Sequence, residues 1–128
     1  MYPGEYLYTR EHEWVHVNGD IATMGVTEFA QQELGEVVFI ELPGPDQHCA
    51  AGDEIGTIES VKAVAEIYAP ATGTVVECNA AVVDSPELLN DDPHGEGWLL
   101  KIRLGSPHEL AALMNAAAYA EYVRSGAE

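Results

Sequence analysis

The segment that decides the fold is Ile58-Glu59-Ser60-Val61-Lys62-Ala63-Val64-Ala65-Glu66-Ile67-Tyr68. It predicts two short strands that meet at Lys62, one of only two lysines in the chain. Successive side chains of a strand point to opposite faces. On the return strand, one face therefore carries Lys62, Val64, Glu66 and Tyr68, and the other carries Ala63, Ala65, Ile67 and Ala69. A lysine at such a tip projects into water, where a modifying enzyme can attach a prosthetic arm; the alternative is an ordinary exposed lysine.

The composition is that of one strongly acidic domain. The chain has 128 residues, 47% of them hydrophobic, and a net charge of −17 from 5 basic and 22 acidic residues. This charge argues against nucleic acid and anionic membranes as partners and favours proteins with basic docking surfaces, although part of it can simply serve solubility. No signal peptide, transit segment or transmembrane run is recognised, so we expect a bacterial cytoplasmic protein in preference to a mitochondrial matrix one.

Strand patterns fill most of the first hundred residues. They cover residues 6–8, 14–17, 21–26, 36–42, 74–78 and 98–104. Asn18-Gly19 predicts a hairpin turn, and Thr27 is placed to begin a short helix that ends at Gly35. Two later helices are predicted to start at Ser85 and Ser106, each followed by proline. Glu109 would complete a capping box for the last helix, expected over about residues 107–124.

One motif suggests an enzyme, and the local pattern argues against it. His12-Glu13-Trp14-Val15-His16 matches the H-E-x-x-H signature of zinc peptidases, which requires a helix to bring both imidazoles to one ion. The alternation of Val15, His16 and Val17 instead predicts a strand, on which residues four apart lie roughly 13 Å from each other. We therefore predict no metal site, and stoichiometric zinc binding would reverse that interpretation.

The two cysteines and the three other histidines show no spacing typical of a metal or catalytic site. Cys49 and Cys78 are predicted to be two unpaired thiols. We expect three histidines to be solvated, namely His48, His94 and His108.

The wider sequence resembles the H protein of the glycine cleavage system over almost its whole length. The motifs that carry the resemblance are Glu59-Ser60-Val61-Lys62-Ala63, Glu66-Ile67-Tyr68-Ala69-Pro70, His12-Glu13-Trp14, Leu34-Gly35-Glu36-Val37-Val38-Phe39, Pro86-Glu87-Leu88-Leu89-Asn90 and Gly95-Glu96-Gly97-Trp98-Leu99. A biotin carrier would show methionine on both sides of the lysine, whereas here the neighbours are Val61 and Ala63. The lipoyl domains of 2-oxoacid dehydrogenases usually show Asp-Lys-Ala and lack the Trp98 block.

The resemblance implies a fold, a cofactor and a non-catalytic role. The fold would be a mainly β barrel-sandwich hybrid, like lipoyl and biotinyl domains, with short helices and a C-terminal helix in a single domain over residues 1–128. Lys62 would carry lipoate in amide linkage. The protein would catalyse nothing itself.

The partners also follow from the resemblance. The lipoyl group would take an aminomethyl group from the PLP-dependent glycine decarboxylase to the tetrahydrofolate-dependent aminomethyltransferase, and dihydrolipoamide dehydrogenase would reoxidise it. Lipoylating enzymes would act on Lys62, and we expect the carrier to be a monomer. Two alternatives stay open: an H-like protein that relays lipoyl groups to other enzymes, and an interaction module with an unmodified lysine.

Two carboxylates are candidates for the cleft that receives the loaded arm in this family. Glu13 occupies the glutamate of the His-Glu-Trp signature, and Glu66 an acidic position after the lysine. Either could hold the cationic aminomethyl amine. The family can have a histidine at the position of Glu33, so no role is carried over to that residue.

Overall fold

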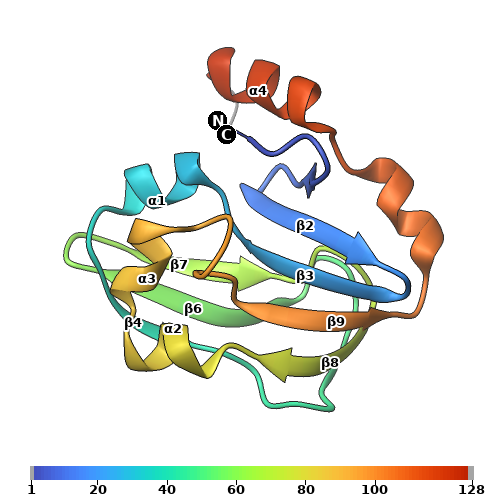
Figure 1. The fold of residues 1–128 in the computed structure, drawn as a ribbon, viewed down its shortest axis with the longest axis horizontal. Coiled ribbons are helices and arrows are strands. Elements are labelled where there is room, and N and C mark those ends of the chain that lie inside the picture. Colours follow the sequence, from blue (N-terminus) through green and yellow to red (C-terminus); the bar gives the residue numbers. More distant parts are fainter. Residues whose placement is uncertain (1, 127–128) are drawn as a thin grey trace.

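Two antiparallel β-sheets pack face to face in the computed structural model, which describes residues 2–126 (Figure 1). The larger sheet has the strand order β1-β2-β3-β9-β8-β5 and the smaller the order β4-β6-β7. The large sheet consists of β1 (Leu7–Tyr8), β2 (Glu13–Asn18), β3 (Ile21–Val26), β9 (Leu100–Leu104), β8 (Gly73–Cys78) and β5 (His48–Cys49). The small sheet consists of β4 (Val37–Glu41), β6 (Glu54–Ser60) and β7 (Val64–Tyr68).

The predicted lysine hairpin is confirmed. β6 and β7 are neighbours with Glu59 opposite Val64, and Lys62 lies in the connection between them. The predicted alternation along β7 is also confirmed, because Val64 and Glu66 are exposed while Ile67 is buried.

The core lies between the inner faces of the two sheets. Ile40, Ile58 and Ile67 of the small sheet are almost completely buried, as are Met24 and Ile102 of the large sheet. Each such side chain contributes about 1.5–3 kcal/mol through removal of its apolar surface from water. The other side of the small sheet faces solvent, as the strand alternation requires.

The residues of the H-E-x-x-H motif do not share a helix. Glu13 to Val17 lie in β2, as predicted, and His12 precedes the strand with φ of 70°. His94 is not solvated as expected: it is half-buried, and its Nε2 accepts a hydrogen bond from the Glu28 amide at 3.1 Å. Both cysteines are unpaired, as predicted, with Cys49 buried and Cys78 partly buried.

The helix α1 (Glu28–Leu34) begins and ends where the sequence predicts. The Thr27 hydroxyl accepts a hydrogen bond from the Ala30 amide, and Gly35 follows the helix with φ of 77°. Positive φ is a conformation that glycine adopts without steric cost.

The helix predicted after Ser85 is present, but Ser85 is not its N-cap. Ser85 instead ends α2 (Ala80–Asp84), because its amide donates to the Ala81 carbonyl. The Asn79 side chain caps α2. α3 (Glu87–Asp91) follows directly, without a side-chain cap.

The C-terminal segment is broken where a continuous helix was predicted. A 3₁₀ helix (Pro107–Ala112) is followed by α4 (Ala116–Arg124), since Met114 exchanges two backbone hydrogen bonds with Tyr8 between them. Ser106 makes no side-chain cap bond. Glu109 does not close a capping box either; its carboxylate accepts hydrogen bonds from the Thr72 amide and hydroxyl. Within residues 2–126, no helix is both long and apolar enough to cross a membrane.

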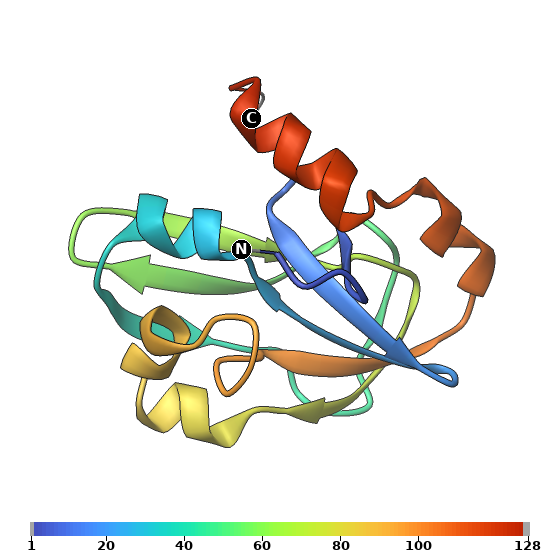
Figure 2. The ribbon, with the colours of Figure 1, turned by 45° about the horizontal axis from the view of Figure 1, so that its top comes forward.

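Aromatic packing fixes α4 against the N-terminal strands (Figure 2). The rings of Tyr8 and Tyr119 are stacked with centroids 4.8 Å apart. The Tyr119 hydroxyl lies 2.8 Å from the Thr27 hydroxyl and 2.7 Å from Nδ1 of His12. One buried side chain of α4 thus connects the start of β2 with the start of α1.

We expect Tyr119→Phe to lower the free energy of unfolding by about 1–3 kcal/mol, because buried polar groups lose a hydrogen-bond partner. Urea denaturation measures this change. Tyr122→Phe, on the same helix, is the control: its hydroxyl donates to the Arg10 carbonyl at an exposed position, and we expect a smaller loss. Equal losses in the two variants would contradict the role assigned to Tyr119.

Candidate functional site

Lys62 projects from a hairpin tip whose backbone is held by one buried serine. The Ser60 hydroxyl accepts hydrogen bonds from the amides of Lys62 and Ala63, at 3.3 and 3.0 Å. The Ser60 amide donates to the Ala63 carbonyl at 2.8 Å and closes the turn. The tip therefore combines an ordered backbone with an exposed lysine side chain.

The tip is also joined to the link between α1 and β4. The Val61 amide donates to the Glu36 carbonyl at 3.0 Å. A Cβ on Gly35 would lie 3.3 Å from Cε of Lys62, so the lysine side chain passes over the end of α1. Asn90 of α3 fixes this link from the other side, accepting from the Val37 amide and donating to the Gly35 carbonyl.

A cleft of about 280 Å³ opens beside the hairpin, between β7, α1 and the start of β2. Its apolar lining comes from Val26, Phe29, Ala30, Leu34, Ile58, Ala63 and Ala65. Its polar lining comes from Glu11, His12, Glu13, Glu33 and Glu66. No lysine or arginine is among these residues, so the cleft suits an apolar chain with a cationic end.

Glu13 is the unusual member of this lining because it is buried. Its side chain is 2% exposed, and its Oε2 accepts a hydrogen bond from the Tyr68 amide at 2.8 Å. The Thr9 hydroxyl donates to its Oε1 at 3.3 Å. Burial raises the pKa of Glu13 to about 8, although these two hydrogen bonds act in the opposite direction. The carboxyl group is therefore largely protonated at neutral pH.

The structure brings the two predicted cleft residues to one place. Glu13 and Glu66 both line the cleft, which Ala63 connects to the neighbouring Lys62. Glu66 is exposed on β7, whereas Glu13 is buried at the start of β2. Their different burial leaves Glu66 in contact with solvent and raises the pKa of Glu13.

Lys101, the other lysine, has a different setting. It lies on β9, and its Nζ is 3.6 Å from Oε1 of Glu77 and 5.2 Å from the ring centre of Trp98. Its amine is therefore already engaged, on a strand in the interior of the large sheet.

Sequence reasoning missed the residues that hold the tip. A serine two positions before Lys62 was a signal for Ser60, because serine hydroxyls bond nearby backbone groups in turns. No local signal pointed to Asn90, which meets Gly35 only through the tertiary structure.

These features define a class of protein: a barrel-sandwich domain, similar to lipoyl domains, that presents a lysine on a hairpin. The family model for the glycine cleavage H-protein matches residues 6–126. The glycine cleavage system H proteins of Herpetosiphon aurantiacus and Symbiobacterium thermophilum are 52% and 48% identical to this chain. The matches cover 98% and 97% of this chain, and 95% and 97% of those proteins.

A solved structure agrees with this match. The crystal structure of a glycine cleavage system H protein from Mycobacterium marinum superposes with a TM-score of 0.84 at 35% identity, covering 98% of this chain and 99% of that one. The chain belongs to the glycine cleavage H-protein family. It is therefore a non-catalytic lipoyl carrier subunit that works with the other components of that system, and the predicted barrel-sandwich fold is confirmed.

We expect the contribution of Glu13 to the free energy of unfolding to fall as pH rises from about 4.5 to about 8. The folded state holds the Glu13 proton up to about pH 8, whereas the unfolded chain releases it near 4.5. The stabilising contribution is therefore complete below pH 4.5 and is lost as pH rises through 8, by at most about 1.4 kcal/mol per pH unit.

Urea denaturation at pH 5, 6.5 and 8 measures this effect. Glu13→Gln retains the packing but has no proton to lose, so its stability relative to the native protein should increase with pH. Glu66→Gln, at an exposed position of the same cleft, is the matched control for the loss of one carboxyl group. A constant difference for Glu13→Gln would contradict the raised pKa.

Proposed function

We propose that Lys62 is the attachment point of lipoate and that the protein carries an aminomethyl group between the enzymes of glycine cleavage. The observation that carries this proposal is the lysine on an ordered tip, directly beside a cleft with an apolar lining and several carboxyl groups. The lipoyl group supplies a disulfide that accepts the one-carbon unit. The residues of this chain present, shelter and release it.

Attachment requires a free amine within reach of an enzyme. The deprotonated Nζ of Lys62 attacks the carbonyl carbon of an activated acyl donor such as an acyl adenylate. The amide C–N bond forms, the C–O bond to adenylate breaks with its electron pair, AMP leaves, and the nitrogen loses one proton. Ser60 contributes by holding the backbone of the tip still while the side chain enters the active site.

The lining of the cleft fits a lipoyl arm. Phe29, Leu34 and Ala65 offer apolar surface to a hydrocarbon chain, and Glu66 offers a negative charge to an amine. Glu13 can respond to its occupant, because a cation beside a buried carboxyl group lowers its pKa. We propose that Glu13 releases its proton to solvent when the protonated aminomethyl amine enters the cleft, and that the resulting carboxylate pairs with this cation.

The proposed partners follow from the chemistry of the carried group. Glycine decarboxylase with PLP loads the arm, the tetrahydrofolate-dependent aminomethyltransferase unloads it, and dihydrolipoamide dehydrogenase reoxidises the dithiol. A tether raises the local concentration of the carried group at each active site. The bacterial relatives support placing this exchange in a bacterial cytoplasm.

We expect Lys62→Arg to abolish acylation and Lys101→Arg to leave it unchanged. Each variant is incubated with a lipoate–protein ligase, lipoate and ATP, and its intact mass and peptide map are determined. Both substitutions preserve the positive charge, so only the loss of the nucleophilic amine separates them from the native protein. A lipoyl group on Lys101, or none on the native protein, would contradict the proposal.

We expect Glu13→Ala and Glu66→Ala to accept lipoate normally but to shorten the lifetime of the aminomethyl-loaded arm. Each removes a carboxyl group that could hold the amine. The decay of the loaded carrier, followed by mass spectrometry after removal of the decarboxylase, measures this lifetime. Unchanged lifetimes in both variants would exclude a role for these residues in sheltering the amine.

A further inference from the structure

Five large apolar side chains of the described residues are exposed to solvent. They are Val38, Phe39, Val61, Val64 and Val83. They come from the hairpin tip, β4 and α2, and we call these five residues the hairpin–groove surface. Contiguous exposed apolar side chains on a soluble domain mark sites of protein contact.

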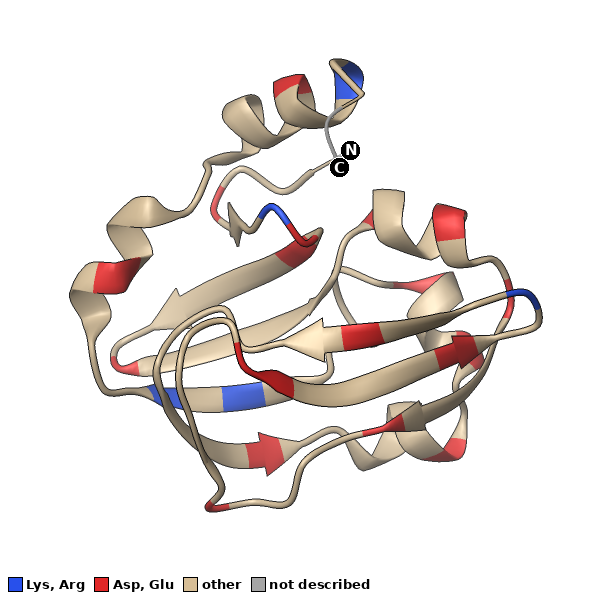
Figure 3. Cartoon of the chain, turned by 180° about the vertical axis from the view of Figure 1, so that it is seen from behind, with Lys and Arg blue, Asp and Glu red and all other residues tan. Residues whose placement is uncertain are grey.

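The strand register makes this surface continuous with the lysine hairpin. Phe39 of β4 lies opposite Glu59 of β6, and Glu59 lies opposite Val64 of β7. Side chains of directly opposed residues share a sheet face, so Phe39 and Val64 both lie on the solvent side. They are 52% and 63% exposed. Figure 3 shows this sheet from behind, with acidic segments on its strands and a basic segment at the hairpin tip.

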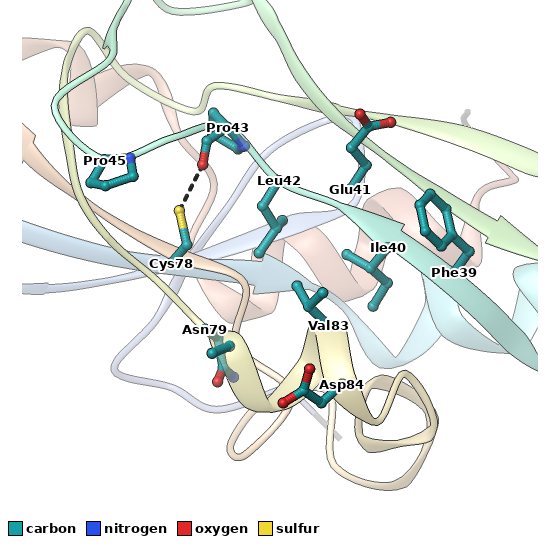
Figure 4. A pocket seen from close by; sticks show the side chains of 11 residues that line it. Phe39, Ile40, Glu41, Leu42, Pro43, Pro45, Cys78, Asn79, Val83 and Asp84 are labelled. Carbon is teal, nitrogen blue, oxygen red and sulfur yellow. Dashed lines mark hydrogen bonds between the residues drawn. The ribbon is translucent and has the colours of Figure 1, made fainter.

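A groove of about 460 Å³ continues this surface between β4 and α2 (Figure 4). Ile40, Leu42 and Val83 point towards the space between the strand and the helix. Phe39 lies at one end of the groove, and Pro45 and Cys78 at the other. The thiol of Cys78 donates to the Pro43 carbonyl at 2.9 Å and is thereby occupied.

The charges around the groove define the chemistry of its occupant. Glu41 and Asp84 are among its lining residues, which include no lysine, arginine or histidine, and the Glu41 carboxylate projects to the opposite side of β4 from Val83 (Figure 4). Such a groove is complementary to an apolar side chain flanked by lysine or arginine. The net charge of −17 extends the same preference to the approach of the partner.

We infer, building on the proposed function, that the hairpin–groove surface docks the enzyme that acylates Lys62. The active site of that enzyme must reach the amine of the unmodified Lys62. Only the length of the lysine side chain separates this amine from the backbone of the tip. Val61 and Val64 flank Lys62 and are therefore covered when its active site closes. Enzymes that act on the far end of the lipoyl arm meet it a full arm length from these residues. An apolar anchor with basic neighbours, which contacts Phe39 beside Glu41, holds the acylating enzyme in place.

The same surface explains why Lys62 is chosen over Lys101. Lys101 lies on β9 with its amine engaged by Glu77 and Trp98, and none of the five residues of the hairpin–groove surface is on that strand. Recognition thus depends on the sheet face beside the lysine as well as on the exposed amine.

The test measures acylation kinetics with a lipoate–protein ligase, lipoate and ATP, with the full-length carrier as the varied substrate. We expect Phe39→Ser to raise KM for the carrier about tenfold and to leave kcat within about twofold, because the anchor contact is lost while the lysine is unchanged. Phe39→Leu keeps an apolar side chain and should restore KM. Thermal unfolding of each variant checks that the sheet is intact.

A charge comparison tests the basic character of the partner. Glu41→Gln combined with Asp84→Asn should raise KM at low salt, and the increase should shrink as ionic strength rises. Glu5→Gln combined with Asp20→Asn removes the same charge at exposed positions outside the groove and should change KM less.

The outcomes separate this inference from the proposed function. If the native protein is not acylated at Lys62, the proposed function fails. If the native protein is acylated and Phe39→Ser matches it in KM, the docking inference is overturned. It is also overturned if Phe39→Ser, once lipoylated, shows a raised KM only with glycine decarboxylase, because the surface would then serve a different partner.

Discussion

The architecture depends on one buried carboxyl group that joins the two sheets. Glu13 begins β2 in the large sheet and accepts a hydrogen bond from Tyr68 at the end of β7 in the small sheet. The same side chain lines the cleft beside the lysine hairpin. Burial keeps it protonated at neutral pH, so the fold places an uncharged carboxyl group where a cationic ligand would make it ionise. The same residue thus contributes a hydrogen bond between the sheets and a carboxyl group to the cleft.

The hairpin tip has a hydrogen-bonded backbone and a lysine side chain without an ion pair among residues 2–126. Ser60 and the Glu36 carbonyl hold the backbone of the tip, while the side chain of Lys62 remains free of ion pairs within residues 2–126. A carrier needs this division, since an ordered base gives partners a fixed surface and a flexible arm gives the carried group its reach. The apolar side chains around the tip supply the surface, and the cleft supplies a resting place for the arm.

The C-terminal segment supports the cleft from behind. Tyr119 reaches across the start of β2 to the start of α1, two elements that line the cleft. Glu109 ties the preceding 3₁₀ helix to Thr72, and its pKa is lowered by the hydrogen bonds that it accepts there. The segment therefore consists of two short helices that are held by different contacts, one through Glu109 and Thr72 and the other through Tyr119.

The sequence by itself determined the hairpin, its lysine and the first helix. Alternation along residues 64–69, the hydroxyl of Thr27 and the permissive backbone of Gly35 act between near neighbours, and such effects can be read from local sequence. The family motifs spread over the chain added the fold and the carrier role, and they pointed to Glu13 and Glu66 as cleft residues.

Where local sequence signals competed with distant contacts, only the tertiary structure decided which conformation formed. Ser85 carries the features of a helix start, yet it is the C-cap of α2, and its amide donates to the Ala81 carbonyl. The apolar spacing after Ser106 predicts one helix, but the pairing of Met114 with Tyr8 interrupts it. Two further features arise from groups far apart in the chain: the raised pKa of Glu13 and the hydrogen bond from Asn90 to the Gly35 carbonyl. Desolvation and hydrogen bonding depend on which groups folding brings together.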